Sequence, residues 1–406
     1  MKIKNRHRFL FFILVLGITS QIVAQNLPIP SYGDLPQPVK PIVCGAEQYV
    51  HYNQFLKNKR VGLIVNQTSV LNKKSGLHLV DVLIAKNIKV VKIFSPEHGF
   101  RGNADAGEKV ANDIDKKTGL PIISLYGANK KPSKEALKDI DVLVFDIQDV
   151  GARFYTYLST MHYAMEACAE NNKLFLLLDR PNPNGYYVAG PVLDLKFKSF
   201  VGMHPIPIVH GMTLGELALM INGEKWLDSN RQCKLEIVTV KNYHHNMKYK
   251  LPIKPSPNLP NAQSILLYPS LCLFEGTSIS VGRGTNKPFQ IIGAPDSSLG
   301  KFTFTPQSLS GSAKNPMYEG KLCYGQDLSQ SKEKFTLKFL AECYNKSSDK
   351  AHFFNNFFVK LIGNETTAAQ IKEGKSWKEI EQTWAKELNN FKVLRKKYLL
   401  YKDFKE

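Results

Sequence analysis

The sequence predicts an α/β fold: a mostly parallel sheet, followed by a second, smaller α/β region at the C-terminal end. Two observations predict the sheet. Short apolar runs recur along the first part of the chain, and segments with helical periodicity lie between them. Repeated strand–helix units of this kind form parallel sheets with helices on both faces. A third observation, the proline-rich segment 251–260, indicates a hinge or a domain boundary.

The predicted strands are apolar runs of five or six residues, at 61–65, 90–94, 121–125, 142–146, 174–178 and 235–240. Helices are predicted between them, at 76–86, 133–138, 156–171 and 213–222. The third helix has one apolar face at helical spacing, formed by Leu158, Met161, Met165 and Cys168. The fourth begins with Thr213 and Glu216, which have the spacing of a capping box.

After the proline-rich segment the regular alternation of apolar runs and helical segments ends. An apolar run at 265–274 precedes a glycine-rich loop at 276–284, and a stretch of mixed strands and loops follows. The chain ends in helices, the last of which begins at Ser376 with Glu379 as a second capping box. We therefore expect one domain over residues 45–252 and a smaller one over residues 253–406.

The first 24 residues have the features of an export signal. Four basic residues precede an apolar core at 9–18, and Ala24 offers a small residue for cleavage. A proline-rich lead-in follows at 25–44. We expect a secreted protein, periplasmic in a host with two membranes, and no later apolar stretch is long enough to predict a membrane span.

The chain is strongly basic. Removing the four basic residues of the signal from the formal net charge of +19 leaves +15. Lysines are spread along the chain without a dense basic block, which fits attraction to an acidic polymer better than a nucleic-acid surface. The six cysteines include no CxxC pair, so their spacing predicts no zinc site, and we expect no metal.

The most informative stretch is SPEHGFRG, at 95–102, directly after a predicted strand. It contains Glu97, His98 and Arg101 on a loop that Pro96 and two glycines keep from continuing as a helix. The carboxyl end of a parallel strand is where such sheets build their ligand crevice. A carboxylate, an imidazole and a guanidinium at that position predict a functional site.

Polar side chains also follow two other predicted strands. Asp146, Asp149, Arg153 and Tyr155 follow the run at 142–145, and Asp179 and Arg180 follow the run at 174–178. If these strands are parallel, all three groups converge on one edge of the sheet. In the second region, Glu275 follows an apolar run, and Arg283 lies between two glycines that let the backbone approach a ligand.

These residues favour carboxylate chemistry over other classes. The Gly-x-Gly around Arg283 lacks the third glycine and opens no helix, so it does not predict a nucleotide site. No GxSxG elbow, HExxH or P-loop is present, and we expect no cofactor. Glycosidic cleavage usually needs two carboxyl groups, one to protonate the leaving oxygen and one as base or nucleophile.

Taken together, the motifs closely resemble the NamZ family, exo-β-N-acetylmuramidases of bacterial cell-wall recycling. The blocks that carry the resemblance run in order from about residue 45 to the C-terminus: SPEHGFRG, DAGE, DIQDVGARFYTY, LDRPNPNG, VHGMTLGELA, SPNLPN, YPSLCLFEGT and RKKYLLY. One departure is Val209, where an arginine is expected before His210. It puts a substrate contact near His210 in question.

The resemblance implies a Rossmann-like first domain, a smaller α/β second domain and an active site in the cleft between them. It implies removal of N-acetylmuramic acid from the non-reducing ends of peptidoglycan fragments, with Glu97 as the catalytic glutamate. The partner of Glu97 stays open at this point: Glu275 is the first choice, and Glu108 and Asp149 are alternatives.

The catalytic candidates are therefore Glu97, His98 and Glu275. The substrate-binding candidates are Arg101, Glu108, Asp149, Arg153, Tyr155, Asp179, Arg180, His210, Asn258, Asn261 and Arg283. The lactyl carboxylate of muramic acid needs a cation, for which Arg101, Arg153, Arg180 and Arg283 are candidates. The competing hypotheses are a non-catalytic cell-wall saccharide-binding protein and, third, a nucleotide-dependent enzyme.

Overall fold

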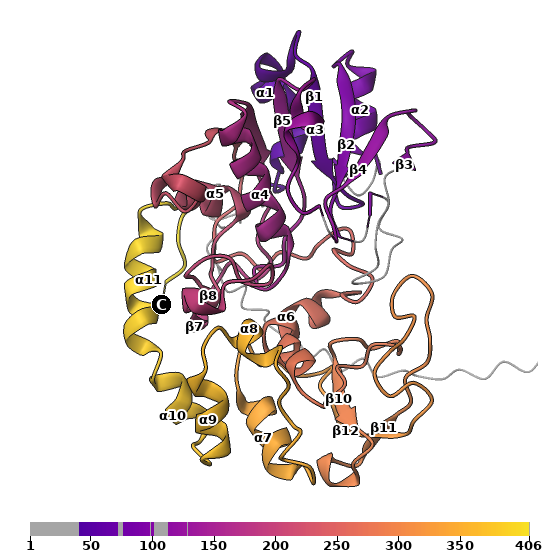
Figure 1. The fold of residues 1–406 in the computed structure, drawn as a ribbon, viewed down its shortest axis with the longest axis vertical. Helices are drawn as coiled ribbons and strands as arrows, with labels where there is room; N and C mark the ends of the chain where they lie inside the picture. The colour runs from indigo at the N-terminus through magenta and orange to yellow at the C-terminus, as the bar shows by residue number, and fades with distance from the viewer. Residues whose placement is uncertain (1–39, 72–75, 98, 101–112, 128, 406) are drawn as a thin grey trace, which may run out of the picture. The chain divides into compact units, whose positions relative to one another are not determined.

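The computed structural model describes residues 40–71, 76–97, 99–100, 113–127 and 129–405. Within it, Pro41–Glu406 forms one compact unit. The predicted export signal and the candidate site residues His98, Arg101 and Glu108 lie outside the described residues. Figure 1 shows the main sheet with its surrounding helices and, at the other end of the view, a smaller sheet with α7 beside it.

The main sheet confirms the predicted parallel α/β fold. In the described part of the chain it has seven strands in the order β3-β4-β2-β1-β5-β6-β9, and every neighbouring pair is parallel except β3 and β4. The strands are β1 (Val61–Val65), β2 (Val90–Ser95), β3 (Asp113–Ile114), β4 (Pro121–Ser124), β5 (Val142–Asp146), β6 (Leu174–Leu178) and β9 (Lys234–Val238). All six predicted strands are present, and the short edge strand β3 was not predicted.

The strand order identifies where a ligand crevice is expected. Counted along the chain without β3, the six parallel strands lie in the order 3-2-1-4-5-6, which is the Rossmann order. The order reverses between β1 and β5, so the loops that follow these two strands lead away to opposite sides. In open α/β sheets, ligands bind outside the carboxyl ends of the strands at this switch point.

Burial explains why these runs form strands. Every residue of β1 and β5 is buried, as expected for central parallel strands covered by helices on both faces. The covering helices of this part are α1 (Tyr49–Leu56), α2 (Leu79–Ala85), α3 (Lys134–Leu137), α4 (Tyr157–Glu170) and α5 (Leu214–Gly223). The predicted apolar face of α4 is buried, and the capping box of Thr213 and Glu216 is formed at the start of α5.

The second part of the chain has a smaller sheet and most of the remaining helices. The antiparallel strands lie in the order β10-β12-β11. Their bounds are β10 (Ile291–Ala294), β11 (Phe302–Phe304) and β12 (Cys323–Asp327). The apolar run at 265–274 is helical: it lies within α6 (Ala262–Leu271) and the 3₁₀ turn Cys272–Gly276.

Helices complete the C-terminal end, and a short ribbon lies against them. The helices are α7 (Lys338–Lys346), α8 (Phe358–Ile362), α9 (Thr366–Lys372), α10 (Trp377–Gln382) and α11 (Ala385–Lys396). The predicted capping box of Ser376 and Glu379 starts α10. The antiparallel ribbon of β7 (Ala189–Val192) and β8 (Pro207–Val209) contacts α11 through β7.

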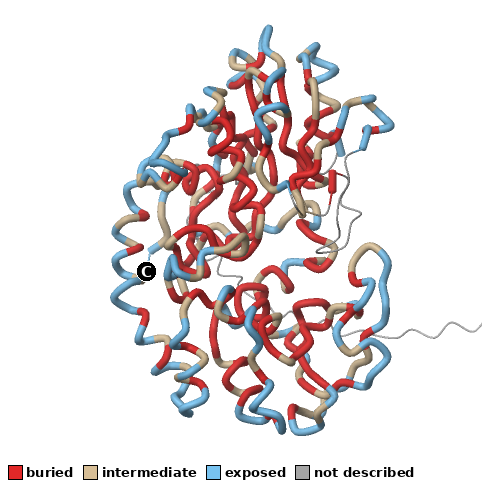
Figure 2. The backbone as a smooth tube through the Cα atoms, in the orientation of Figure 1, coloured by how far each residue is buried: buried red, intermediate tan, exposed pale blue. Residues whose placement is uncertain are grey.

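The largest hydrophobic core crosses the proline-rich segment. It extends from Ile64 and Phe145 of the main sheet through Tyr268 of α6 to Phe358 of α8 and Phe391 of α11. Figure 2 shows this buried backbone continuing through the middle of the molecule. The predicted boundary after residue 252 therefore divides the sequence but not the core, and the domain bounds stay a prediction.

The structure also shows the state of the cysteines and whether any helix could span a membrane. All six cysteines are buried free thiols. Among the described residues, the structure contains no helix that is both long enough and apolar enough to span a membrane.

Candidate active site

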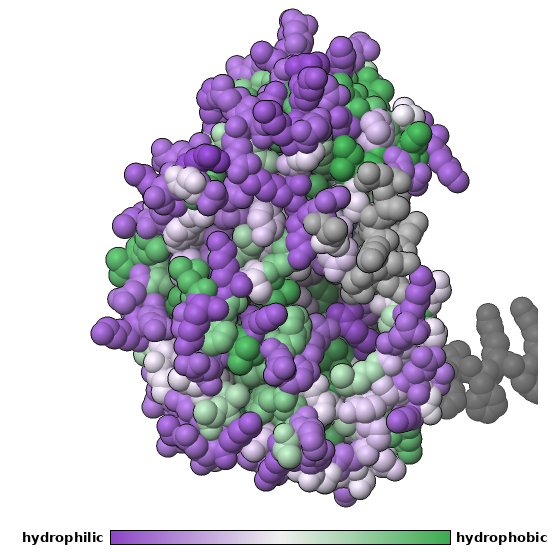
Figure 3. Space-filling view, viewed as in Figure 1, coloured by the Kyte–Doolittle hydropathy of each residue, from purple (hydrophilic) through white to green (hydrophobic). Residues whose placement is uncertain are grey.

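A pocket of about 720 Å³ lies where loops after the strands of the main sheet meet the second part of the chain. Figure 3 shows a hollow near the middle of the pictured face, where polar and apolar side chains meet. Residues before the proline-rich segment contribute one wall: Glu97, Tyr126, Phe154, Tyr155, Thr156, Phe200 and Val201. The opposite wall comes from residues 256–361 and includes Asn258, Tyr268, Glu275, Arg283, Phe289 and Lys314.

Glu97 is held in this pocket by hydroxyl groups. It lies two residues after β2, and its Oε2 accepts a hydrogen bond from Thr156 Oγ1 at 2.7 Å. Tyr126, which follows β4, also hydrogen-bonds Glu97. Burial, the charge of Glu97 and this hydrogen bond raise the pKa of Tyr126 to about 12, so its hydroxyl stays a proton donor at neutral pH. Neutral donors thus orient the Glu97 carboxyl group.

Glu275 lies on the opposite wall and forms an ion pair with Arg283. Nε and Nη2 of Arg283 both lie 2.7 Å from Glu275 Oε1. The guanidinium also lies over the ring of Phe289, with its carbon 5.0 Å from the ring centroid. Burial lowers the pKa of Arg283, but the adjacent Glu275 raises it more, so the net shift is upward and the guanidinium stays charged.

The Arg283 loop takes its shape from its two glycines. Gly282 and Gly284 both have positive φ, at 75° and 81°. A Cβ at Gly284 would lie 2.6 Å from the carbonyl oxygen of Gln307, so only glycine fits there without a shift of backbone. The backbone at Gly284 therefore approaches the segment that contains Gln307, and not a ligand as expected. The side chain of Arg283 lines the pocket.

Aromatic rings form part of the pocket surface. Tyr268 contacts Phe154, Tyr155 and Phe289 edge to face, with ring centroids 5.0 to 5.8 Å apart. The hydroxyl of Tyr155 donates to the carbonyl oxygen of Pro255 at 2.9 Å. A pocket with apolar rings and a few charged or hydrogen-bonding groups matches the general pattern of small-molecule sites.

Five of the predicted site residues line this pocket: Glu97, Tyr155, Asn258, Glu275 and Arg283. The Asn258 side chain donates from Nδ2 to the carbonyl oxygen of Ser312 at 2.7 Å and fixes the loop that contains Lys314. Sequence reasoning missed Thr156 and Tyr268, although both lie inside the recognised blocks. It also missed Tyr126, which directly follows the predicted strand at 121–125, and Lys314, for which the sequence contains no comparable signal.

Two predicted arginines do not reach the pocket, because their guanidinium groups bind other parts of the protein. Arg153 is 1 % exposed and donates to four carbonyl oxygens, those of Pro191, Ile206, Leu361 and Ile362. Arg180 is buried in an ion pair with Asp146, in which Nη2 lies 2.9 Å from Oδ2. We therefore correct both expectations: Arg153 ties the first part of the chain to α8, and Arg180 neutralises a buried carboxylate.

Asp179 belongs to a buried network rather than to the pocket. Its carboxylate accepts hydrogen bonds from the Tyr401 hydroxyl, Thr213 Oγ1 and the Gly215 amide at 2.6 to 2.9 Å. Burial raises the pKa of Asp179 to about 6, against the effect of these donors. The network fastens the C-terminal end of the chain to the start of α5.

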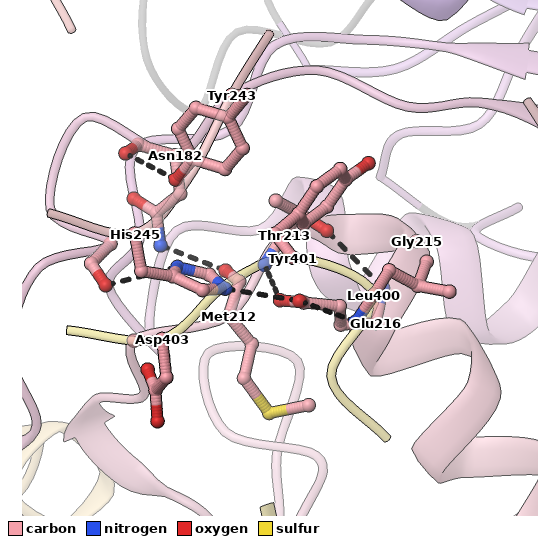
Figure 4. A network of polar contacts seen from close by, with 12 residues as sticks. Asn182, Met212, Thr213, Gly215, Glu216, Tyr243, His245, Leu400, Tyr401 and Asp403 are labelled. Carbon is pink, nitrogen blue, oxygen red and sulfur yellow. Dashed lines mark hydrogen bonds and ion pairs between the residues drawn. The ribbon is translucent and has the colours of Figure 1, made fainter. Parts of the chain in front are cut away.

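The same network continues through a second carboxylate. Figure 4 shows Glu216 between His245 and the backbone of Leu400. His245 Nε2 lies 3.0 Å from Glu216 Oε1, and the Leu400 amide donates to the same oxygen at 2.9 Å. Both side chains are fully buried. Because every member has partners inside the protein, the network is structural.

Asp149, His210 and Asn261 also lie away from the pocket. Asp149 accepts from the Gly151 amide at 2.6 Å, and burial raises its pKa to about 7. It faces a cavity of about 10 Å³, which has no room for a sugar. Burial lowers the pKa of His210 to about 3, and this neutral ring accepts from the Met212 amide. Asn261 caps α6.

These positions correct the expected role of all three as substrate contacts and remove Asp149 as a partner for Glu97. Within the described ranges, no cluster of three or more His, Cys, Asp or Glu side chains is arranged to hold a metal ion.

Two family models match the chain. They describe the N-terminal and C-terminal parts of the exo-β-N-acetylmuramidase NamZ and cover residues 61–263 and 266–401. The chain is 42% identical over 376 residues to the peptidoglycan β-N-acetylmuramidase NamZ of Bacillus subtilis (strain 168), covering 86% of this chain and 89% of that protein.

Two solved structures have the same fold. A DUF1343 family protein of Bacteroides fragilis NCTC 9343 has a TM-score of 0.83 and 49% identity, over 90% of this chain and all of that one. A second DUF1343 protein of the same strain has a TM-score of 0.76 and 33% identity with the same coverage.

Proposed function

Because this chain belongs to the exo-β-N-acetylmuramidase NamZ family, we propose that it is an exo-acting glycoside hydrolase that releases N-acetylmuramic acid from the non-reducing ends of peptidoglycan fragments. The observation that supports this most directly is the pair of glutamates in one pocket. Glu97 and Glu275 come from opposite walls, and hydrolysis of a glycosidic bond usually requires two carboxyl groups on either side of that bond.

The two carboxyl groups have different partners, which supports different roles. Glu97 is the carboxyl group that is not paired with Arg283, so we assign it proton donation to the leaving oxygen, and the Thr156 and Tyr126 hydroxyls hold it in position. Glu275 is paired with the Arg283 guanidinium, so we assign it the ionised role of base or nucleophile. This choice leaves Glu108, which lies outside the described residues, as the alternative partner.

Recognition of muramic acid needs a cation for its lactyl carboxylate. Arg283 lines the pocket and uses Nε and Nη2 to contact Glu275, which leaves part of its five-donor guanidinium for a second carboxylate. Arg153 and Arg180 are engaged elsewhere. We therefore assign the lactyl contact to Arg283, with Arg101 as the alternative outside the described residues.

The proposal includes export of the protein. The basic and apolar composition of residues 1–24 supports a signal, and the proposed substrate lies outside the cytoplasmic membrane. Cell fractionation of the full chain and of a chain that begins at residue 25 tests this point. Loss of the extracytoplasmic pool on truncation is expected, and an unchanged distribution contradicts export by this segment.

Release of 4-nitrophenol from 4-nitrophenyl β-N-acetylmuramide tests the activity, with the β-N-acetylglucosaminide as the matched analogue that lacks the lactyl group. We expect turnover of the muramide, weaker turnover of the glucosaminide, and free N-acetylmuramic acid as a product of natural fragments. A folded protein that binds these fragments without turning over either kind of substrate is instead a saccharide-binding protein.

A further inference from the structure

We propose that a second pocket beside the active site binds the N-acetylhexosamine on the reducing-end side of the cleaved bond, the leaving group of the reaction. This inference rests on the proposed function. The pocket has a volume of about 520 Å³. We call it the leaving-group pocket, and it is lined by Gln67, Pro252, Ile253, Lys254, Ser256, Pro257 and Gly311.

The leaving-group pocket is continuous with the candidate active site. Ser256 lines both pockets, and Gly311 of one is followed in the chain by Ser312 of the other. The hydrogen bond from Asn258 Nδ2 to the Ser312 carbonyl oxygen holds the two segments together at 2.7 Å. The two pockets are therefore adjacent, and the proposal places the two sugars of a disaccharide one in each pocket.

The wall of the leaving-group pocket is connected to the residues that hold Glu97. The carbonyl oxygen of Pro255 accepts hydrogen bonds from the hydroxyls of Tyr155 and Tyr157, at 2.9 and 3.4 Å. These two tyrosines flank Thr156, whose hydroxyl donates to Glu97. A general acid must reach the oxygen between the two sugars, so the leaving-group sugar must lie beside it. The contacts through Pro255, Tyr155 and Thr156 link the leaving-group pocket to Glu97, as this role requires.

The lining chemistry fits a saccharide. The Gln67 amide donates from Nε2 to the carbonyl oxygens of Lys254 and Pro255 at 3.3 and 3.1 Å and so holds the segment that forms the pocket wall. Pro252, Ile253 and Pro257 supply apolar surface for the carbon face of a sugar ring. Among the described residues that line the pocket none is acidic and Lys254 is basic, which suits neutral or anionic sugars.

A comparison of two substrates tests this inference. The disaccharide of N-acetylmuramic acid β-linked to N-acetylglucosamine has a leaving-group sugar, and 4-nitrophenyl β-N-acetylmuramide does not. Ile253→Trp and Lys254→Trp each add a bulky ring to the leaving-group pocket. We expect kcat/KM for the disaccharide to fall by about tenfold or more, and kcat/KM for the aryl muramide to change by less than about twofold.

Lys250→Trp is the matched control, because Lys250 is also exposed and lines a different depression. It is expected to leave both substrates unaffected. Lys254 is exposed, so its variant stays informative if Ile253→Trp does not fold. An equal loss on both substrates, or no loss on either, overturns the leaving-group pocket. A wild-type protein that hydrolyses neither substrate contradicts the proposed function itself.

Discussion

Thr156 and Glu97 are joined by a hydrogen bond of 2.7 Å between the Thr156 hydroxyl and Glu97 Oε2, although 59 positions separate them in the chain. Glu97 follows β2 and Thr156 follows β5, the two strands that flank β1. The contact therefore joins loops on both sides of the switch point of the sheet. It fixes the glutamate at the place where this fold binds ligands.

Removing the Thr156 hydroxyl should slow the reaction without abolishing binding. Removing one partner of a buried hydrogen bond costs about 1–3 kcal/mol, so Thr156→Val should lower kcat by about 5- to 100-fold with a smaller change in KM. Thr156→Ser keeps the hydroxyl and should recover most of the activity. Steady-state kinetics on the aryl muramide measures both. Equal activity of the Val and Ser variants would show that the hydroxyl does not position Glu97.

Arg283 should determine the preference for muramic acid. Arg283→Lys keeps a charge but loses the planar fork that binds a carboxylate while contacting Glu275. We expect the ratio of kcat/KM values for the muramide and the glucosaminide to fall by about tenfold or more. The same assay on both substrates gives this ratio. An equal loss on both would mean that Arg283 serves only to hold Glu275.

Arg153 should matter for stability rather than for recognition. Arg153→Met leaves four buried carbonyl oxygens without their donor, and we expect a loss of about 3–5 kcal/mol in the free energy of unfolding. Arg60→Met is the control, because Arg60 forms a partly exposed ion pair with Asp141 and its loss should change the stability far less. Urea denaturation measures both, and a similar small loss in each variant contradicts the assignment.

The buried Asp149 should make stability depend on pH. Its pKa is raised by burial to about 7 in the folded state, so the folded protein keeps this proton while the unfolded chain releases it near pH 4. The contribution of Asp149 to the free energy of unfolding is therefore present below pH 4 and is lost as the pH rises toward 7. Asp149→Asn should flatten this part of the profile.

Asp141 provides a control of opposite sign. The hydrogen bonds from Arg60 hold the pKa of Asp141 below its usual range, so its contribution to stability is lost as the pH falls through the acidic range. Urea denaturation from pH 4 to pH 7 should show Asp149→Asn diverging from the wild type, whereas Asp141→Asn should diverge only below about pH 4 and in the opposite direction. Parallel profiles for Asp149→Asn and the wild type would contradict the buried, protonated aspartate.

The centre of the sheet was predictable because β1, β5 and β6 are buried on both faces and read as nearly uninterrupted apolar runs. The capping boxes at Thr213 and Ser376 were predictable because they depend on residues three positions apart. The run at 265–274 has no such local signal: an apolar segment of that length fits a buried helix as well as a strand, and packing against the rest of the core decides.

The positions of the strand ends predicted which edge of the sheet holds the site, but not which side chains enter the pocket. The carboxyl ends of β2 and β5 place Glu97 and Arg153 at the same edge of the sheet, but side-chain direction is not encoded at that level. Arg153 points into the protein because four backbone carbonyl groups need donors there. Lys314 reaches the pocket through tertiary folding of a segment without a periodic pattern, which a single sequence does not reveal.

The central claim is that Glu97 and Glu275 together perform the chemistry. The most direct test is the value of kcat on the disaccharide of N-acetylmuramic acid β-linked to N-acetylglucosamine, whose leaving oxygen must be protonated, for Glu97→Gln, Glu275→Gln and the double variant, each shown to be folded by its thermal unfolding. We predict that each single variant loses about 1,000-fold or more and that the double variant is little slower than the slower single one, because the two groups act as a unit. A Glu275→Gln enzyme that keeps kcat within about tenfold of the wild type would contradict the pair.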